Sequence, residues 1–210
     1  MKKQKTIYHL IVDKSGSMAD VTNQTITGYN EQIQQIQSVQ RDFPDQVITV
    51  GLTAFNGNID HHYFGVPAIN AARLNTETYI PDGSTSLYDA IGSSVQKLEQ
   101  QQARDNREYD TSVVVIVLTD GYENSSRNFR LADIKRMIGR LEETGKWTFS
   151  FIGATLDAVE VAAQMDIKVQ NSFSFTKEGM KEEVWDKVSS GIRTYANKRQ
   201  RGENLDEFYK

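Results

Sequence analysis

Three short segments of this 210-residue chain carry oxygen-bearing side chains of the kind that bind hard metal ions. They lie at Asp13 to Ser17, Gly83 to Thr85, and Thr119 to Gly121. Together they supply two carboxylates and three hydroxyls, from Asp13, Asp120, Ser15, Ser17 and Thr85. This set suits Mg²⁺, which takes oxygen ligands in nearly octahedral geometry at about 2.0 to 2.1 Å and keeps waters in its shell. The chain has no cysteine, so it offers no thiolate to a softer metal.

The charge of this set favours binding over chemistry. Two carboxylates balance the charge of one divalent cation, and the neutral hydroxyls add none. A coordination position left to water can therefore accept a further carboxylate from another molecule at an electrostatic advantage. The sequence predicts a metal site that can bind an acidic group of another molecule.

Strands and helices must bring these segments together. Thr6 to Val12 and Val113 to Leu118 are apolar runs of strand length, and each ends at a turn that contains one of the aspartates. Apolar residues at helical spacing follow, from Ile26 to Phe43 and from Leu131 to Leu141. Strands that alternate with helices predict a doubly wound, Rossmann-like α/β fold with helices on both faces. Ligands of such sheets bind beyond the carboxyl ends of the strands, where the strand order reverses.

The remaining elements complete a mostly parallel sheet of about six strands. Val47 to Phe55 and Ile59 to Val66 flank an Asn-Gly turn and predict a hairpin, so one edge strand is antiparallel. Later strands are expected at 147–152 and 167–169, and later helices at 156–165 and around 180–192. Ser86 is expected to cap a helix, with Asp89 at the third helical position completing a capping box.

Length and composition indicate one domain, residues 1–200, followed by a short charged C-terminal tail, 201–210. The net charge of −4 gives no general attraction to nucleic acid. No run approaches the roughly 20 apolar residues that span a bilayer, so no membrane association is expected. The N-terminus lacks the apolar region of a secretory signal, and a cytoplasmic location is the expectation.

The oxygen-bearing residues resemble the von Willebrand factor type A family, whose metal-ion-dependent adhesion site is written D-x-S-x-S, then a distant Thr, then a distant Asp. Asp13, Ser15 and Ser17 match the first motif, and Thr85 and Asp120 match the two distant positions. The resemblance runs from about Lys5 to Tyr195. It implies that the hydroxyls touch the metal, while the sequence leaves open whether the two aspartates bind it directly or through water.

The resemblance implies a stand-alone, intracellular, bacterial-type member of this family that works as a divalent-cation-dependent protein–protein interaction module. The cation is expected to be Mg²⁺ or Mn²⁺, and its partner a protein that presents an Asp or Glu carboxylate. Intracellular members often work beside ATPases in multi-protein systems, so such a system is the expected setting. Met18, Tyr122, Glu123 and Asn124 flank the metal-binding turns and are candidates for a partner-binding rim; the alternative is that they are ordinary loop residues.

Two other functions compete with this interpretation. A Mg²⁺-dependent phosphohydrolase of the haloacid dehalogenase type also places Asp after the first strand, but it needs a second Asp two residues later, where this chain has Ser15. We therefore expect no enzymatic activity. A scaffold subunit with a purely structural metal stays open. His61 and His62 point to opposite faces of a strand and are expected to be ordinary hairpin residues, and His9 to be an interior histidine.

Overall fold

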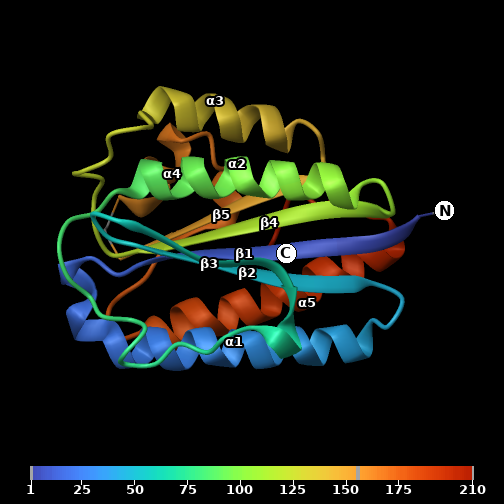
Figure 1. The fold of residues 1–210 in the computed structure, drawn as a ribbon, viewed down its shortest axis with the longest axis horizontal. Helices are drawn as coiled ribbons and strands as arrows, with labels where there is room; N and C mark the ends of the chain where they lie inside the picture. Colours follow the sequence, from blue (N-terminus) through green and yellow to red (C-terminus); the bar gives the residue numbers. More distant parts are fainter. Residues whose placement is uncertain (1, 155–156, 210) are drawn as a thin grey trace.

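The computed structural model describes residues 2–154 and 157–209. One sheet of six strands lies between two layers of helices (Figure 1). Its strand order is β3-β2-β1-β4-β5-β6, and all neighbours are parallel except β2 and β3. The strands are β1 (Lys3–Asp13), β2 (Val47–Phe55), β3 (Ile59–Pro67), β4 (Tyr109–Thr119), β5 (Trp147–Gly153) and β6 (Ser172–Ser174). The predicted fold class and the antiparallel edge strand are confirmed.

Helices cover both faces of the sheet (Figure 1). They are α1 (Thr22–Asp42), α2 (Leu87–Asp105), α3 (Leu131–Glu142), α4 (Ala158–Gln164) and α5 (Asp186–Arg201). The side chains of β1 alternate between two cores, as the pleat of a strand requires. Tyr8 and Leu10 pack with α1 and α5, whereas Ile7 and Ile11 pack with α2, α3 and α4. Among the described residues no helix is both long and apolar enough to cross a membrane.

The two central strands bring the candidate metal ligands to one edge of the sheet. Val12 of β1 lies level with Leu118 of β4 in the parallel register. Asp13 and Thr119 are therefore neighbours at the carboxyl edge. The chain runs from β1 to β2 on one side and from β4 to β5 on the other, so the strand order reverses between β1 and β4. Ligands of open α/β sheets bind at such a reversal.

The last strand differs from the prediction. Residues 167–169 were expected to form it, but β6 is Ser172–Ser174, after a 3₁₀ turn at Val169–Asn171. Ile167 is buried and Val169 is 59% exposed, so this apolar run places one residue in the core and leaves another in solvent. A short run with one buried residue does not need to be a strand. The expected helix at 156–165 is α4, and its first expected residue lies outside the described residues.

The capping box predicted at the start of α2 is wrong. Ser86 makes no side-chain cap; its hydroxyl instead pairs with Ser125 at 2.8 Å. The Asp89 carboxylate accepts the backbone N–H groups of residues 127, 128 and 129 at 2.8 to 2.9 Å. Asp89 therefore anchors the long loop after β4 to α2. A local helix signal could not reveal this, because the loop lies far from Asp89 in the sequence.

The segment after α5, expected to be a charged tail, packs against the sheet. Gly202 adopts a left-handed conformation (φ 67°) that ends α5 and turns the chain back. Phe208 then has no exposed surface, and the Tyr209 hydroxyl pairs with Ser150 Oγ of β5 at 2.6 Å. Thr148 Oγ1, also on β5, donates to the Leu205 carbonyl at 3.0 Å. The aromatic residues of this segment thus belong to the core.

Candidate metal centre

Asp13 ends β1 and has no exposed surface. Its Oδ1 accepts the backbone N–H of Ser15 at 2.7 Å, and its Oδ2 accepts the Thr119 hydroxyl at 2.5 Å. Burial raises the pKa of Asp13 to about 6, although both hydrogen bonds lower it. A positive charge close to this carboxylate would stabilise its ionised form.

Asp120 is the second buried carboxylate of the centre, and a pair of hydroxyls connects it to the first loop. Its side chain has no exposed surface. Ser17 Oγ donates to Asp120 Oδ1 at 2.5 Å and lies 3.2 Å from Ser15 Oγ. Ser15, Ser17 and Asp120 therefore lie in one contiguous group of oxygen atoms, although Asp120 follows a different strand.

Thr85 joins this group from the start of α2, beside Gly121. A Cβ placed on Gly121 would lie 3.3 Å from Thr85 Oγ1, 3.5 Å from Ser17 Oγ and 3.9 Å from Asp13 Oδ2. Oxygens from two segments thus converge beside the glycine of the third, where there is no side chain. Asn124 holds Thr85, because its Oδ1 accepts the Thr85 N–H at 2.9 Å and its own N–H donates to the Thr85 carbonyl at 3.0 Å.

These residues fit a hard divalent cation. Two buried carboxylates provide two negative charges, and the hydroxyls provide neutral oxygens, which is the donor set that Mg²⁺ and Mn²⁺ accept. Among the side chains that the structure describes, no three of His, Cys, Asp or Glu gather to hold a metal. A cation here would consequently rely on hydroxyl and water ligands beside the two aspartates.

Sequence reasoning missed three residues that shape the centre. Thr119 holds the Asp13 carboxylate, and the Tyr79 hydroxyl donates to the Asp13 carbonyl at 2.5 Å. Lys177 Nζ lies 2.9 Å from Asp120 Oδ2. Thr119 stands directly before Asp120, so its place at the strand end was a usable signal. Nothing in the sequence pattern links Tyr79 or Lys177 to the centre.

A family model of the von Willebrand factor type A domain matches residues 9–182. The chain belongs to this family. No curated protein sequence matches the chain.

Solved structures share the fold of this von Willebrand factor type A domain. The ArnB paralog VWA2 from Sulfolobus acidocaldarius is 17% identical, with 89% of this chain and 46% of that one covered and a TM-score of 0.53. The manganese-loaded TRAP protein of Plasmodium vivax is 18% identical (85% and 71% covered, TM-score 0.56). Proximal thread matrix protein 1 from the mussel byssus, with a zinc-occupied MIDAS motif, is 14% identical (92% and 46% covered, TM-score 0.56). The chain spans less than half the length of two of these structures.

The candidate rim residues of this von Willebrand factor type A domain differ in exposure. Tyr122 is 55% exposed, and its hydroxyl donates to Asp157 Oδ1 at 2.8 Å. Asn124 is also exposed. The Glu123 carboxylate accepts the N–H groups of Ser125 and Ser126 in its own loop and that of Tyr88 at the start of α2. Met18 has no exposed surface and packs in the core under α1, so it is not part of an exposed rim.

A hollow of about 650 Å³ opens beside Asp120. One wall is the segment from Ser174, the last residue of β6, to Glu178. The other contains Glu183, in the helical turn before α5, and Lys187, the second residue of α5. The domain therefore has room for an extended group next to the candidate metal centre.

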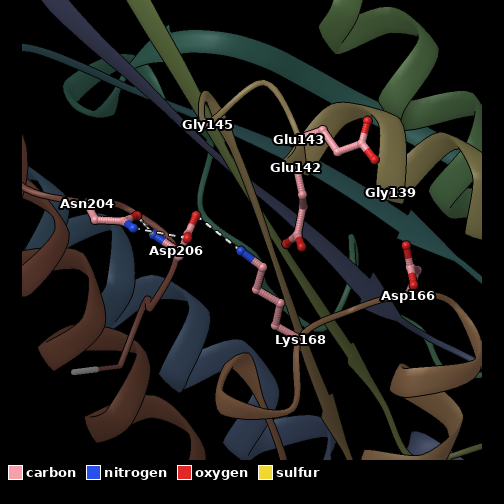
Figure 2. A pocket seen from close by; sticks show the side chains of 8 residues that line it. All are labelled: Gly139, Glu142, Glu143, Gly145, Asp166, Lys168, Asn204 and Asp206. Carbon is pink, nitrogen blue, oxygen red and sulfur yellow. Dashed lines mark hydrogen bonds and ion pairs between the residues drawn. The ribbon is translucent and has the colours of Figure 1, made fainter.

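A second hollow, of about 570 Å³, lies at the opposite edge of the sheet, where Gly145 precedes the first residue of β5 (Figure 2). Glu142, Asp166, Lys168 and Asp206 are among its lining residues, and Lys168 Nζ pairs with Asp206 Oδ1 at 3.1 Å. Burial raises the pKa of Glu142 to about 7. None of the predicted site residues lines this hollow.

The histidines lie apart from the centre. His9 is buried, and its Nε2 pairs with Thr53 Oγ1 at 2.9 Å. The same hydroxyl lies 3.0 Å from His61 Nδ1. Burial lowers the pKa of His9 to about 3, so this ring is neutral at physiological pH.

Proposed function

We propose that this chain is a divalent-cation-dependent protein–protein interaction module. A Mg²⁺ or Mn²⁺ ion is held at the carboxyl edge of the sheet and coordinates an Asp or Glu of a partner protein. Five residues hold the ion: Asp13, Ser15, Ser17, Thr85 and Asp120. The observation that carries the proposal is the convergence of Thr85 Oγ1, Ser17 Oγ and Asp13 Oδ2 around Gly121.

The charges of the centre support binding of an acidic group. The two aspartates balance a divalent ion, and the hydroxyls leave its remaining positions able to attract a carboxylate. Thr119 and the Ser15 N–H orient Asp13, while Ser17 orients Asp120. A bound cation supplies the electrophilic centre on which the partner's oxygen docks. A manganese-loaded relative and one with a zinc-occupied MIDAS motif support the use of a divalent metal.

The surface around the centre suits a protein partner. Tyr122 and Asn124 are exposed beside Gly121 and can contact residues that flank the partner's carboxylate. The hollow next to Asp120 can take a neighbouring part of the same partner. We propose that the partner belongs to a cytoplasmic multi-protein system that includes an ATPase.

Catalysis is not part of the proposal. Among the described residues, the hydroxyls of Thr119 and Ser15 hydrogen-bond to the Asp13 carboxylate and that of Tyr79 to its carbonyl. None of these hydroxyls is a general base at neutral pH. A screen of phosphate esters, nucleotides and peptides tests this. Turnover that vanishes in Asp13→Asn would contradict it.

Metal binding is tested by calorimetry and thermal unfolding. Saturating Mg²⁺ or Mn²⁺ should raise the melting temperature relative to chelator, because ligand binding to the native state stabilises it by mass action. Asp13→Ala and Asp120→Ala should abolish this rise, whereas the double variant His61→Ala with His62→Ala should keep it. Equal melting temperatures in metal and chelator would contradict the proposal.

Partner binding is tested by capturing interacting proteins in Mg²⁺ and in chelator, followed by titration of the captured partner. Thr85→Ala should weaken metal-dependent binding. Thr85→Asp should suppress it even with metal bound, because an internal carboxylate neutralises the centre. Circular dichroism checks folding. Equal partner affinity in chelator and in Mg²⁺ would show that the cation is not the bridge.

A further inference from the structure

Lys177 contacts the candidate metal centre from a segment that the sequence motif does not include. It follows β6, and its Nζ lies 2.9 Å from Asp120 Oδ2. The same Nζ donates to the Ser17 carbonyl at 2.7 Å. Asp20, whose side chain is 82% exposed, is farther away at 3.5 Å. An ion pair and a hydrogen bond, both to predicted metal-binding residues, therefore hold the Lys177 ammonium.

The burial of Asp120 explains why this contact matters. Its side chain has no exposed surface, whereas that of Lys177 is 34% exposed. A buried carboxylate is costly unless a positive charge or hydrogen-bond donors compensate it. Ser17 Oγ donates to Oδ1, and Lys177 supplies the positive charge at Oδ2. Lys177 thus supplies, from within the chain, a positive charge at the Asp120 carboxylate.

The two oxygens of Asp120 face different groups, and a divalent ion held at the centre would share this carboxylate with Lys177. Asp120 Oδ1 faces Ser17 and the converging oxygens, and Oδ2 faces Lys177. The metal and the ammonium would share one negative charge, and like charges that flank one carboxylate repel each other. The bond from Lys177 to the Ser17 carbonyl does not involve Asp120, so it keeps the ammonium near the centre.

We propose that Lys177 is an internal counter-cation of the metal centre, which stabilises the metal-free domain and weakens its affinity for a divalent cation. This inference rests on the proposed function. It raises the cation concentration that is needed to fill the centre, because the metal must compete with a positive charge that the chain itself provides. Lys177 acts as a positioning and affinity-setting residue and not as a metal ligand.

The test compares Lys177→Met with wild type by calorimetric titration of Mg²⁺ alone. Removing the ammonium should tighten Mg²⁺ binding by about tenfold, the order expected for one unit charge taken from the surroundings of a divalent ion. In chelator the variant should melt at a lower temperature than wild type. Its rise in melting temperature on adding Mg²⁺ should be the larger of the two. An ion pair with a purely structural role would lower both melting temperatures equally and leave the Kd unchanged.

Two further variants serve as controls for the change in Mg²⁺ affinity. Lys187→Met removes a cation from the same hollow, where its Nζ lies over the Phe173 ring at 4.3 Å, and should keep the wild-type Kd. Lys177→Arg keeps the charge and should also bind like wild type. Circular dichroism confirms folding of each variant.

The possible results separate the two proposals. If wild type binds Mg²⁺ and Lys177→Met binds it with equal or lower affinity, this inference is overturned while the proposed function stands. If neither protein binds Mg²⁺ or Mn²⁺, both are overturned.

Discussion

The hydroxyl of Thr119 donates a hydrogen bond of 2.5 Å to Oδ2 of Asp13, so the last residue of β4 holds the carboxylate at the end of β1. The same hydroxyl accepts the Gly121 N–H at 3.1 Å. One side chain thereby positions both a candidate ligand and the glycine around which the other oxygens gather. Mutating a group that orients a metal ligand in this way typically weakens metal affinity by about 10- to 100-fold.

Thr119→Val should weaken Mg²⁺ binding by about tenfold or more, because the isosteric side chain cannot hold the Asp13 carboxylate. Calorimetric titration measures the effect. Thr111→Val is the matched control, since Thr111 is a buried residue at the other end of β4 whose hydroxyl has no hydrogen-bond partner among the described residues. It should leave the Kd unchanged. Equal affinities for the two variants would remove Thr119 from the centre.

Gly121→Ala should reduce metal binding, because its Cβ would lie 3.3 Å from Thr85 Oγ1 and 3.5 Å from Ser17 Oγ and would enter the space where these oxygens converge. We expect a weaker Mg²⁺ affinity with little change in the melting temperature in chelator. Gly16→Ala is the control, since a Cβ there makes ordinary contacts with Gly83 at 3.5 Å or more. Metal binding that survives in Gly121→Ala as well as in Gly16→Ala would place the metal elsewhere.

Phe208→Ala should lower the free energy of unfolding by about 3 to 5 kcal/mol, the usual cost of removing a buried aromatic ring. Phe208 has no exposed surface and packs against Gly191 of α5. Glu203→Ala, an exposed residue of the same segment, should change it by about 0.5 kcal/mol or less. Urea unfolding measures both. A cost for Phe208→Ala no larger than that for Glu203→Ala would show that residues 203–209 do not contribute to the fold.

Glu142→Gln should stabilise the domain at high pH and not at low pH. Burial raises the pKa of Glu142 from 4.5 to about 7, so the folded state keeps its proton over a range in which the unfolded chain has lost it. The stability contributed by this group is therefore full below about pH 4.5 and falls as the pH rises to about 7. Gln keeps an oxygen that can accept the Phe149 N–H, which Glu142 Oε1 accepts at 3.2 Å.

Melting temperatures of wild type and Glu142→Gln across this range measure the effect. The difference between them should be near zero at the acid end and should grow in favour of the variant toward neutral pH. Glu143→Gln removes a charge from the exposed neighbouring residue and controls for net charge. Parallel pH profiles for wild type and Glu142→Gln would contradict the raised pKa.

The sequence alone was sufficient to predict a mostly parallel sheet with one antiparallel edge strand and to nominate the centre. The apolar runs before Asp13 and Asp120 are strands because they are continuous and β-rich, and their parallel pairing follows from the helices between them. Parallel strands end at the same edge, so the two aspartates had to lie at one edge of the sheet, and the strand order β1-β4 makes them neighbours. Thr85 lies beside them in the structure. This agrees with the family motif, whose residue types occur in the same order in this sequence.

Tertiary structure decided what depends on contacts between segments distant in the chain. Met18 was a rim candidate by position, but the turn after β1 directs it into the core. Asp89 has the sequence position of a capping-box residue. Its carboxylate instead binds the backbone of Arg127 and Asn128, which are 38 and 39 residues away in the sequence. The charge of Lys177 is visible in the sequence, whereas its place beside Asp120 depends on where the fold puts the segment after β6. Residue type and local periodicity specify elements and their ends; which side chains meet across those ends is a property of the packed chain.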